Sequence, residues 1–283
     1  MHFPMSQSNP LQLVSYLAPN MFGFYKAVGA SLSQVLGIDT QVVQSQYDPL
    51  EDPMMLEDRL DLAFICGLPF ARRHRVISSQ LQAFVAPVMQ ASRYENRPIY
   101  FSDLIVSAQS NLHSFADLAG KTWCYNDPGS NSGYNLVRQR LIQGGYPSRF
   151  FGQVMPSGSH QCSIRWVVEG RVDCAAIDST VLEQELRDFP EFSPSLRVIE
   201  SLGPCPMPPI VAAQRLGTGL IHAIGSALCE PDAALQAAMR RAHILKYVPV
   251  QCEDYEELAT MYDAAVEAGF EADAQRSSPE CRP

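Results

Sequence analysis

The chain has 283 residues, of which 46% are hydrophobic and 18% are charged, and its formal net charge is −9. This composition is typical of a soluble globular protein with one large domain or two smaller ones. The acidic balance argues against a broad nucleic-acid or membrane surface, and no apolar run approaches the ~20 residues of a membrane-spanning helix.

The first part of the chain is predicted to alternate strands with helices. Residues 11–17 alternate apolar and polar side chains as a strand does, and residues 21–36 carry apolar side chains at helical spacing before a glycine. A strand at 40–45, a short helix at 54–59 and an apolar strand at 60–65 follow. This β-α-β-α-β order predicts a parallel sheet covered by helices.

The middle of the chain repeats this order. The expected elements are a turn at 115–121, strands at 122–125, 153–155 and 172–177, and helices at 134–143 and 157–168. Later, the proline-rich stretch 204–209 predicts a stiff connector, because proline fixes φ. Apolar periodicity then predicts three helices, at 219–228, 233–247 and 255–268.

Two segments of the chain resemble each other. Residues 57–65 and 169–177 share an arginine, an aspartate, an alanine and an isoleucine at matching places. The similarity predicts two related lobes, although two helix-to-strand turns can also agree by chance. In either case we expect Asp61 and Asp173 to anchor their strand starts rather than to take part in chemistry.

The extended stretches 99–106 and 196–202 lie where crossovers would join two such lobes. We therefore expect an α/β fold with two lobes, each a mostly parallel sheet flanked by helices. The first lobe would comprise residues 1–102 and 203–283, including the C-terminal helices, and the second residues 103–202. A hinged clamshell of this kind usually holds its ligand in the cleft between the lobes.

The most informative stretch is the loop Asp-Pro-Gly-Ser-Asn-Ser-Gly at residues 127–133. It follows an apolar strand and opens a helix, where the first N–H groups have no partner inside the helix and the macrodipole adds positive charge. Its small hydroxyl and amide side chains add further donors. The loop therefore predicts an anion site, with an N-terminal cap that binds no ligand as the alternative.

Five short motifs give the chain a family resemblance. They occur in register at 117–122 (DLAGKT), 127–134 (DPGSNSGY), 157–160 (SGSH), 170–176 (GRVDCAA) and 208–211 (PPIV). Together they resemble the phosphonate, phosphite and phosphate substrate-binding proteins of ABC transporters. The resemblance implies the type II periplasmic-binding-protein fold, an ABC permease as partner, and a small phosphate-, phosphite- or phosphonate-like oxyanion as ligand.

The resemblance also implies which residues hold the ligand. In the family, the loop that matches Ser130-Asn131-Ser132-Gly133 grips the phosphorus oxygens, and residues matching His160 and Tyr100 add donors. The usual family loop is Ser-Thr-Ser-Gly, so Asn131 replaces a hydroxyl by a longer amide. The acidic residues that hold an amine in aminophosphonate binders are matched by Thr180 and Pro208, which disfavours a zwitterionic ligand.

Two other classes of function remain open at this point. An enzyme of the same fold, like those of menaquinone or thiamine-precursor biosynthesis, would use His160, Asp178 and Tyr100 as acid–base groups. A soluble sensory lobe would bind the ligand and signal to a partner. Of the three, we favour the binding protein over an enzyme, with Asp178 as a further ligand-site residue.

The sequence suggests no cofactor and no metal site, because no histidine has ligand spacing with cysteine or carboxylate. The first residues lack the basic and apolar regions of a signal peptide. As written, the chain is therefore expected in the cytoplasm, and in the periplasm if a leader precedes it.

Overall fold

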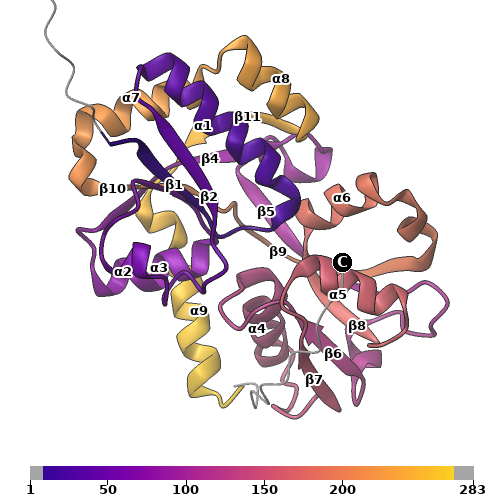
Figure 1. The fold of residues 1–283 in the computed structure, drawn as a ribbon. Helices are drawn as coiled ribbons and strands as arrows, with labels where there is room; N and C mark the ends of the chain where they lie inside the picture. The colour runs from indigo at the N-terminus through magenta and orange to yellow at the C-terminus, as the bar shows by residue number, and fades with distance from the viewer. Residues whose placement is uncertain (1–8, 271–283) are drawn as a thin grey trace, which may run out of the picture. The chain divides into compact units, whose positions relative to one another are not determined.

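The computed structural model describes residues 9–270, which form two compact units. The first comprises residues 9–98 and Met207–Tyr255, and the second comprises Ile99–Pro206 and residues 256–270. The chain thus passes between the units three times. Each unit is an α/β assembly with a sheet of its own (Figure 1).

The first unit is built on a sheet with the strand order β11-β4-β10-β3-β1-β2. Its strands are β1 (Leu11–Ser15), β2 (Thr40–Gln44), β3 (Leu62–Phe64), β4 (Leu81–Met89), β10 (Ile210–Ala213) and β11 (Ile244–Pro249). Its helices are α1 (Phe22–Leu36), α2 (Pro53–Leu56), α3 (Gly67–Val76), α7 (Gly217–Cys229) and α8 (Ala233–Arg241). Helix α1 contacts α7 and α8, and these three cover β2, β4 and β11.

The second unit has the strand order β7-β6-β8-β5-β9. Its strands are β5 (Ile99–Ser107), β6 (Thr122–Tyr125), β7 (Gln153–Pro156), β8 (Cys174–Asp178) and β9 (Leu196–Pro206). Its helices are α4 (Leu136–Gln143), α5 (His160–Val168), α6 (Ser179–Asp188) and α9 (Glu256–Glu267). Every residue of the central strand β8 is buried, so both faces of the sheet are covered.

The predicted β-α-β order at the start of each unit is confirmed, and antiparallel strands complete both sheets. Strand β1 is parallel to β2 and β3, and β6 is parallel to β7 and β8. The remaining pairs, which join β10, β4 and β11 in one unit and β5, β8 and β9 in the other, are antiparallel. The sheets are therefore mixed, because strands from later in the chain return beside the first ones.

Several elements differ from the sequence expectation. The helix predicted at 233–247 ends at Arg241, and residues 244–249 pair with β4 as strand β11. A short apolar run fits a helix or a strand, and here the available strand partner decides. The prolines at 204 and 206 lie in β9, where Pro206 pairs with Ile99; β9 is the edge strand, which tolerates proline. Helix α9 packs on α4, in the second unit.

The two similar segments place matching aspartates at matching positions. In the first unit, Asp61 Oδ2 accepts from the backbone N–H of Gln12 in β1 at 2.7 Å. In the second, Asp173 Oδ2 accepts from the backbone N–H of Thr122 in β6 at 2.8 Å. Each aspartate also donates its own N–H to the carbonyl of that same partner. The predicted anchoring role of both aspartates is therefore confirmed.

The anchor in the first unit is expected to stabilise the fold measurably. Asp61 also pairs with Arg215 and is nearly buried, so Asp61→Asn should lower the free energy of unfolding by about 1.5–3 kcal/mol in urea titrations. Asp58→Asn is the matched control, because Asp58 pairs with the same arginine at 3.5 Å from a half-buried position. Asp58→Asn should lower the free energy of unfolding by less than about 1 kcal/mol. Equal losses in the two variants would contradict the anchoring role.

Candidate functional site

The loop after β6 enters α4 through one π-helical turn, Asn131–Asn135. Ser130 caps this turn, because its Oγ accepts from the N–H of Gly133 at 3.0 Å. The side chain of Ser130 therefore acts as the N-terminal cap of the turn. Within residues 9–270, the N–H groups of Asn131 and Ser132 donate to no protein acceptor. The turn thus presents two backbone donors and the positive end of a helix.

Asn131 is fully buried, and both ends of its amide bond to protein groups. Its Nδ2 donates to Tyr100 Oη at 2.8 Å, and its Oδ1 accepts from Asn135 Nδ2 at 3.0 Å. The longer amide side chain therefore joins the loop to β5, which carries Tyr100. The side chain of Asn131 is thus occupied by protein groups, which leaves its backbone N–H as the group without a protein acceptor in the described chain.

Ser132 and His160 form a buried pair in which Ser132 Oγ lies 3.1 Å from His160 Nε2. Burial lowers the pKa of His160 to about 3, so its ring is neutral. If Nε2 accepts from the hydroxyl, Nδ1 carries the ring hydrogen and has no partner in the described chain. If Nε2 donates to the serine oxygen, the hydroxyl hydrogen of Ser132 takes no part in the pair. In either tautomer the pair keeps one N–H or O–H hydrogen for a ligand.

Gly133 lets this turn pack closely against two neighbouring side chains. A Cβ atom at this position would overlap Asn126 Oδ1 and would lie 3.2 Å from His160 Cε1. Any larger residue would therefore displace Asn126 and press on the histidine ring. The glycine allows the loop to lie close against the start of α5.

Asp178 ends β8 and caps α6. Its Oδ1 accepts from the N–H and the Oγ1 of Thr180 at 2.8 and 2.7 Å. The pKa of Asp178 is raised to about 6, mainly by burial and to a smaller extent by nearby Asp103, while the hydrogen bonds from Thr180 oppose the rise. No hydrogen bond joins Asp178 to His160 among the described residues. A serine–histidine–aspartate triad is therefore not formed.

The seven predicted site residues all lie in the second unit. Hydrogen bonds connect Tyr100 with Asn131, Ser130 with Gly133, and Ser132 with His160, all in or beside one turn of chain. Asp178 lies in register opposite Ser102. Asp178 therefore lies next to this network in the sheet. Its own hydrogen bonds come from Thr180 at the start of α6.

Two residues of the network were not predicted. Ser102 donates its Oγ to the carbonyl of Ser132 at 2.8 Å, and Asn135 donates to Asn131. The spacing of Asn135, four residues after Asn131, places both on one helix face and could have indicated it. Ser102 follows Tyr100 by two residues on one strand face, which is too common a pattern to single it out.

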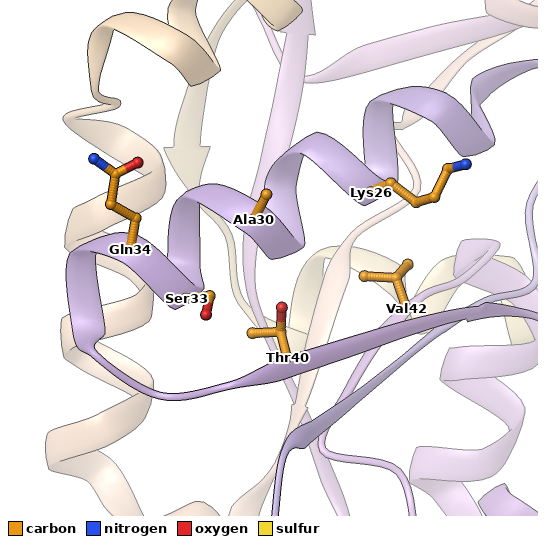
Figure 2. A pocket seen from close by; sticks show the side chains of 6 residues that line it. All are labelled: Lys26, Ala30, Ser33, Gln34, Thr40 and Val42. Atoms are coloured by element: carbon orange, nitrogen blue, oxygen red, sulfur yellow. The ribbon is translucent and has the colours of Figure 1, made fainter.

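A groove in the first unit is separate from this network. It lies between α1 and β2, and Figure 2 shows its lining residues Lys26, Ala30, Ser33, Gln34, Thr40 and Val42. None of the predicted site residues lines it. Within residues 9–270, no cluster of histidine, cysteine and carboxylate side chains is arranged to hold a metal ion, and no helix is long and apolar enough to cross a bilayer.

Several solved structures with a similar fold are binding proteins of transport systems. The binding component of an ABC phosphonate transporter from Pseudomonas aeruginosa superposes with a TM-score of 0.78 at 17% identity, covering 95% of this chain and 91% of that one. PhnD1 from Prochlorococcus marinus, in complex with methylphosphonate, gives 0.76 at 16% identity, covering 91% and 98%. The alkanesulfonate-binding protein SsuA from Xanthomonas axonopodis, bound to MOPS, gives 0.63 at 17% identity, covering 94% and 95%.

The fold is therefore that of the periplasmic binding proteins, as the sequence resemblance implied. None of the curated protein sequences matches the chain. A family model does match, over residues 14–255, and it describes the periplasmic substrate-binding protein of phosphonate ABC transporters. The chain belongs to this family. The family is a binding component of transporters and not an enzyme.

The buried neutral histidine predicts how stability depends on pH. Unfolding returns the pKa of His160 from about 3 to its ordinary value of 6.5, so the unfolded chain binds more protons between these values. His160 should therefore reduce the free energy of unfolding as pH falls below 6.5, by at most about 1.4 kcal/mol per pH unit. Above pH 6.5 the ring is neutral in both the folded and the unfolded chain, so His160 causes no loss of stability there.

Denaturation of wild type and His160→Gln from pH 8 to pH 4.5 measures this contribution. Asp178, whose pKa is raised, acts in the opposite direction but is common to both proteins, so the difference between the curves isolates His160. The curves should converge or cross as pH falls. Parallel curves would show that His160 is not held neutral by burial.

Proposed function

We propose that this chain binds a phosphonate-, phosphite- or phosphate-like oxyanion at the turn Ser130–Gly133, as the binding component of an ABC transport system. The observation that carries the proposal is the set of donors at this turn. The N–H groups of Asn131 and Ser132 have no protein acceptor in the described chain, and the Ser132–His160 pair keeps one hydrogen to donate. An oxyanion is the ligand that such a set favours.

The donors are neutral, and their strength comes from the charge of the ligand. A hydrogen bond to a charged group contributes about 1.5–3 kcal/mol. Three to five such bonds support micromolar binding or better after the costs of ordering the site. Tyr100 lies beside this set, because its Oη accepts from Asn131 Nδ2 at 2.8 Å.

The enzyme alternative has one geometric argument in its favour, the Ser132–His160 pair. A serine nucleophile needs a histidine that a third group orients. Here His160 Nδ1 has no partner in the described chain, and the hydrogen bonds of Asp178 go to Thr180. Together with the family, this favours binding over catalysis. No observation supports the sensory alternative in particular.

The family also supports a cellular location and a transport partner for this chain. Its members are periplasmic components of ABC transporters. We propose that this chain acts in the periplasm and delivers its ligand to a permease. Fractionation of cells that express the chromosomally tagged protein would test the location, and retention of the tag in the cytoplasm would contradict it.

Binding should depend on the hydroxyl of Ser132. Calorimetric titration with methylphosphonate, phosphite, phosphate and sulfate should give binding by at least one phosphorus oxyanion. Ser132→Ala should raise its Kd by about tenfold or more, because a charge-assisted donor is removed. Ser163→Ala is the matched control, since Ser163 is buried in α5 and bonds to Ser157 Oγ. An unchanged Kd for Ser132→Ala would contradict the proposed site.

The side chain of Thr180 predicts a preference among phosphonates. Thr180 donates to Asp178 and stands where aminophosphonate binders carry an acidic residue by resemblance. It cannot pair with an ammonium group. We therefore expect 2-aminoethylphosphonate to bind at least about tenfold more weakly than methylphosphonate, the equivalent of one lost charge-assisted bond. Equal affinities in the same titration would refute this preference.

A further inference from the structure

Arg138 lies in α4, five residues beyond Gly133, and its positive charge is buried without a hydrogen-bond acceptor. The residue is only 2% exposed, and its Nε and Nη2 atoms have no partner in the described chain. Among residues 9–270, no carboxylate pairs with it. The guanidinium group stays protonated at any pH that the fold tolerates, so a full charge is held in the interior of the second unit.

Two tyrosine rings lie against this guanidinium group. Its central carbon is 5.0 Å from the ring centroid of Tyr134 and 5.1 Å from that of Tyr262 in α9. An aromatic face attracts a cation through its quadrupole, but this attraction replaces only part of the hydration that burial removes. The rings therefore hold the arginine in place and leave its charge uncompensated.

Arg140, two residues further along α4, shows how the same side chain is accommodated when it is paired. It also lies over two aromatic rings, those of Phe115 and Tyr146, at 4.8 and 5.9 Å. In addition it donates to Glu200 in β9 at 2.6 Å. A buried charge without such a partner destabilises a protein, so a neutral side chain of similar length would suit folding better at position 138.

The position of Arg138 relates its charge to the proposed oxyanion site. Seven residues of helix, from Asn131 to Arg138, rise about 10 Å. Helical side chains lean toward the N-terminus of their helix, and the contact between Arg138 and the Tyr134 ring shows that this one does so. The guanidinium group therefore lies roughly 5–10 Å from the N–H groups of Asn131 and Ser132.

A buried charge at this distance acts on an anion without touching it. At an effective dielectric constant of about 20, two unit charges roughly 5–10 Å apart attract each other enough to change an affinity about tenfold or more. Salt screens a buried charge much less than an exposed one. His160 beside the turn is neutral, so it supplies no such attraction.

We infer that Arg138 determines the charge specificity of the oxyanion site: its buried, unpaired guanidinium group favours a doubly charged ligand over a singly charged one without contacting either. The inference rests on the proposed function, because it specifies which ionic form of that ligand is bound. Each negative charge on the ligand gains about tenfold in affinity, so the dianion gains about tenfold over the monoanion.

Replacement of the charge by an apolar chain of similar length tests this role. Calorimetric titration at pH 8 uses whichever of methylphosphonate, phosphite and phosphate wild type binds best. Arg138→Met should raise its Kd by about tenfold or more. Arg140→Met is the matched control, because it removes an arginine over two rings of the same helix whose charge Glu200 already balances. Its Kd should stay within about threefold of the wild-type value.

Thermal unfolding of the same variants separates a charge effect from a packing effect. Arg138→Met removes a buried charge that has no partner, so its Tm should equal or exceed that of wild type. A role of Arg138 in packing alone predicts the opposite result, a lower Tm with an unchanged Kd, and that result would overturn the inference.

The pKa of the bound ligand gives a readout that a merely structural role would not move. A phosphorus oxyanion gains its second charge near neutral pH, and its ³¹P chemical shift follows this ionisation. In a titration of the complex from pH 5 to pH 9, Arg138→Met should raise the pKa of the bound ligand by about 1, because a pKa difference of 1 equals a tenfold change. Arg140→Met should leave that pKa unchanged.

The other ionisable groups near Arg138 are common to wild type and both variants, so they cancel in the comparison. The carboxylates of α9 are exposed, and the two rings that face Arg138 are phenols. Glu200 pairs with Arg140, and its remaining charge in Arg140→Met is half-exposed to solvent. The groups concerned are Tyr134, Tyr262, Glu256, Glu257, Asp263, Glu267 and Glu200, with His160 and Asp178 beside the site.

The outcomes separate the two proposals. If wild type binds none of the oxyanions, the proposed function fails and this inference fails with it. If wild type binds while Arg138→Met and Arg140→Met change the Kd equally, only the role of Arg138 is overturned. The same holds if the pKa of the bound ligand is identical in wild type and Arg138→Met.

Discussion

The hydrogen bond from Asn131 to Tyr100 is the constraint on which the proposed site depends. It joins the first turn of the helical segment after β6 to strand β5, two elements about thirty residues apart in the chain. Both partners are almost fully buried, so neither can exchange the bond for one to water. The backbone donors of the turn and the hydroxyl of Tyr100 are consequently held in one arrangement before any ligand arrives. Such preorganisation reduces the cost of binding.

Burial decides the chemistry of the titratable groups around this bond. It keeps His160 neutral at physiological pH, so the histidine serves as a hydrogen-bond partner of Ser132 and adds no positive charge. It also raises the pKa of Asp178, whose carboxylate is occupied by the start of α6. The proposed site therefore offers an anion dipoles and hydroxyls as direct contacts rather than a positive charge, in keeping with the negative net charge of the chain.

The two units share one hydrogen-bonded arrangement and differ in the rest of their sheets. Asp61 and Asp173 each exchange hydrogen bonds with the first residues of a neighbouring parallel strand, which fixes the register where the two strands begin. Beyond this common β-α-β core, antiparallel strands from later in the chain extend each sheet in its own way. The proposed ligand residues lie in the second unit, and the turn Ser130–Gly133 follows β6, the strand that Asp173 bonds to.

The sequence by itself determined the features that depend on local order. The periodicity of residues 21–36 and the glycine at position 37 predicted α1 and its end, and the motifs around Ser132 and His160 predicted the family and the loop. Only the tertiary structure decided what depends on distant partners. Residues 244–249 form a strand because β4 offers a free edge, and Asn131 bonds to Tyr100 because the loop lies against β5. Neither partner is near in sequence, and a hydrogen bond across that separation leaves no periodic signal in the chain.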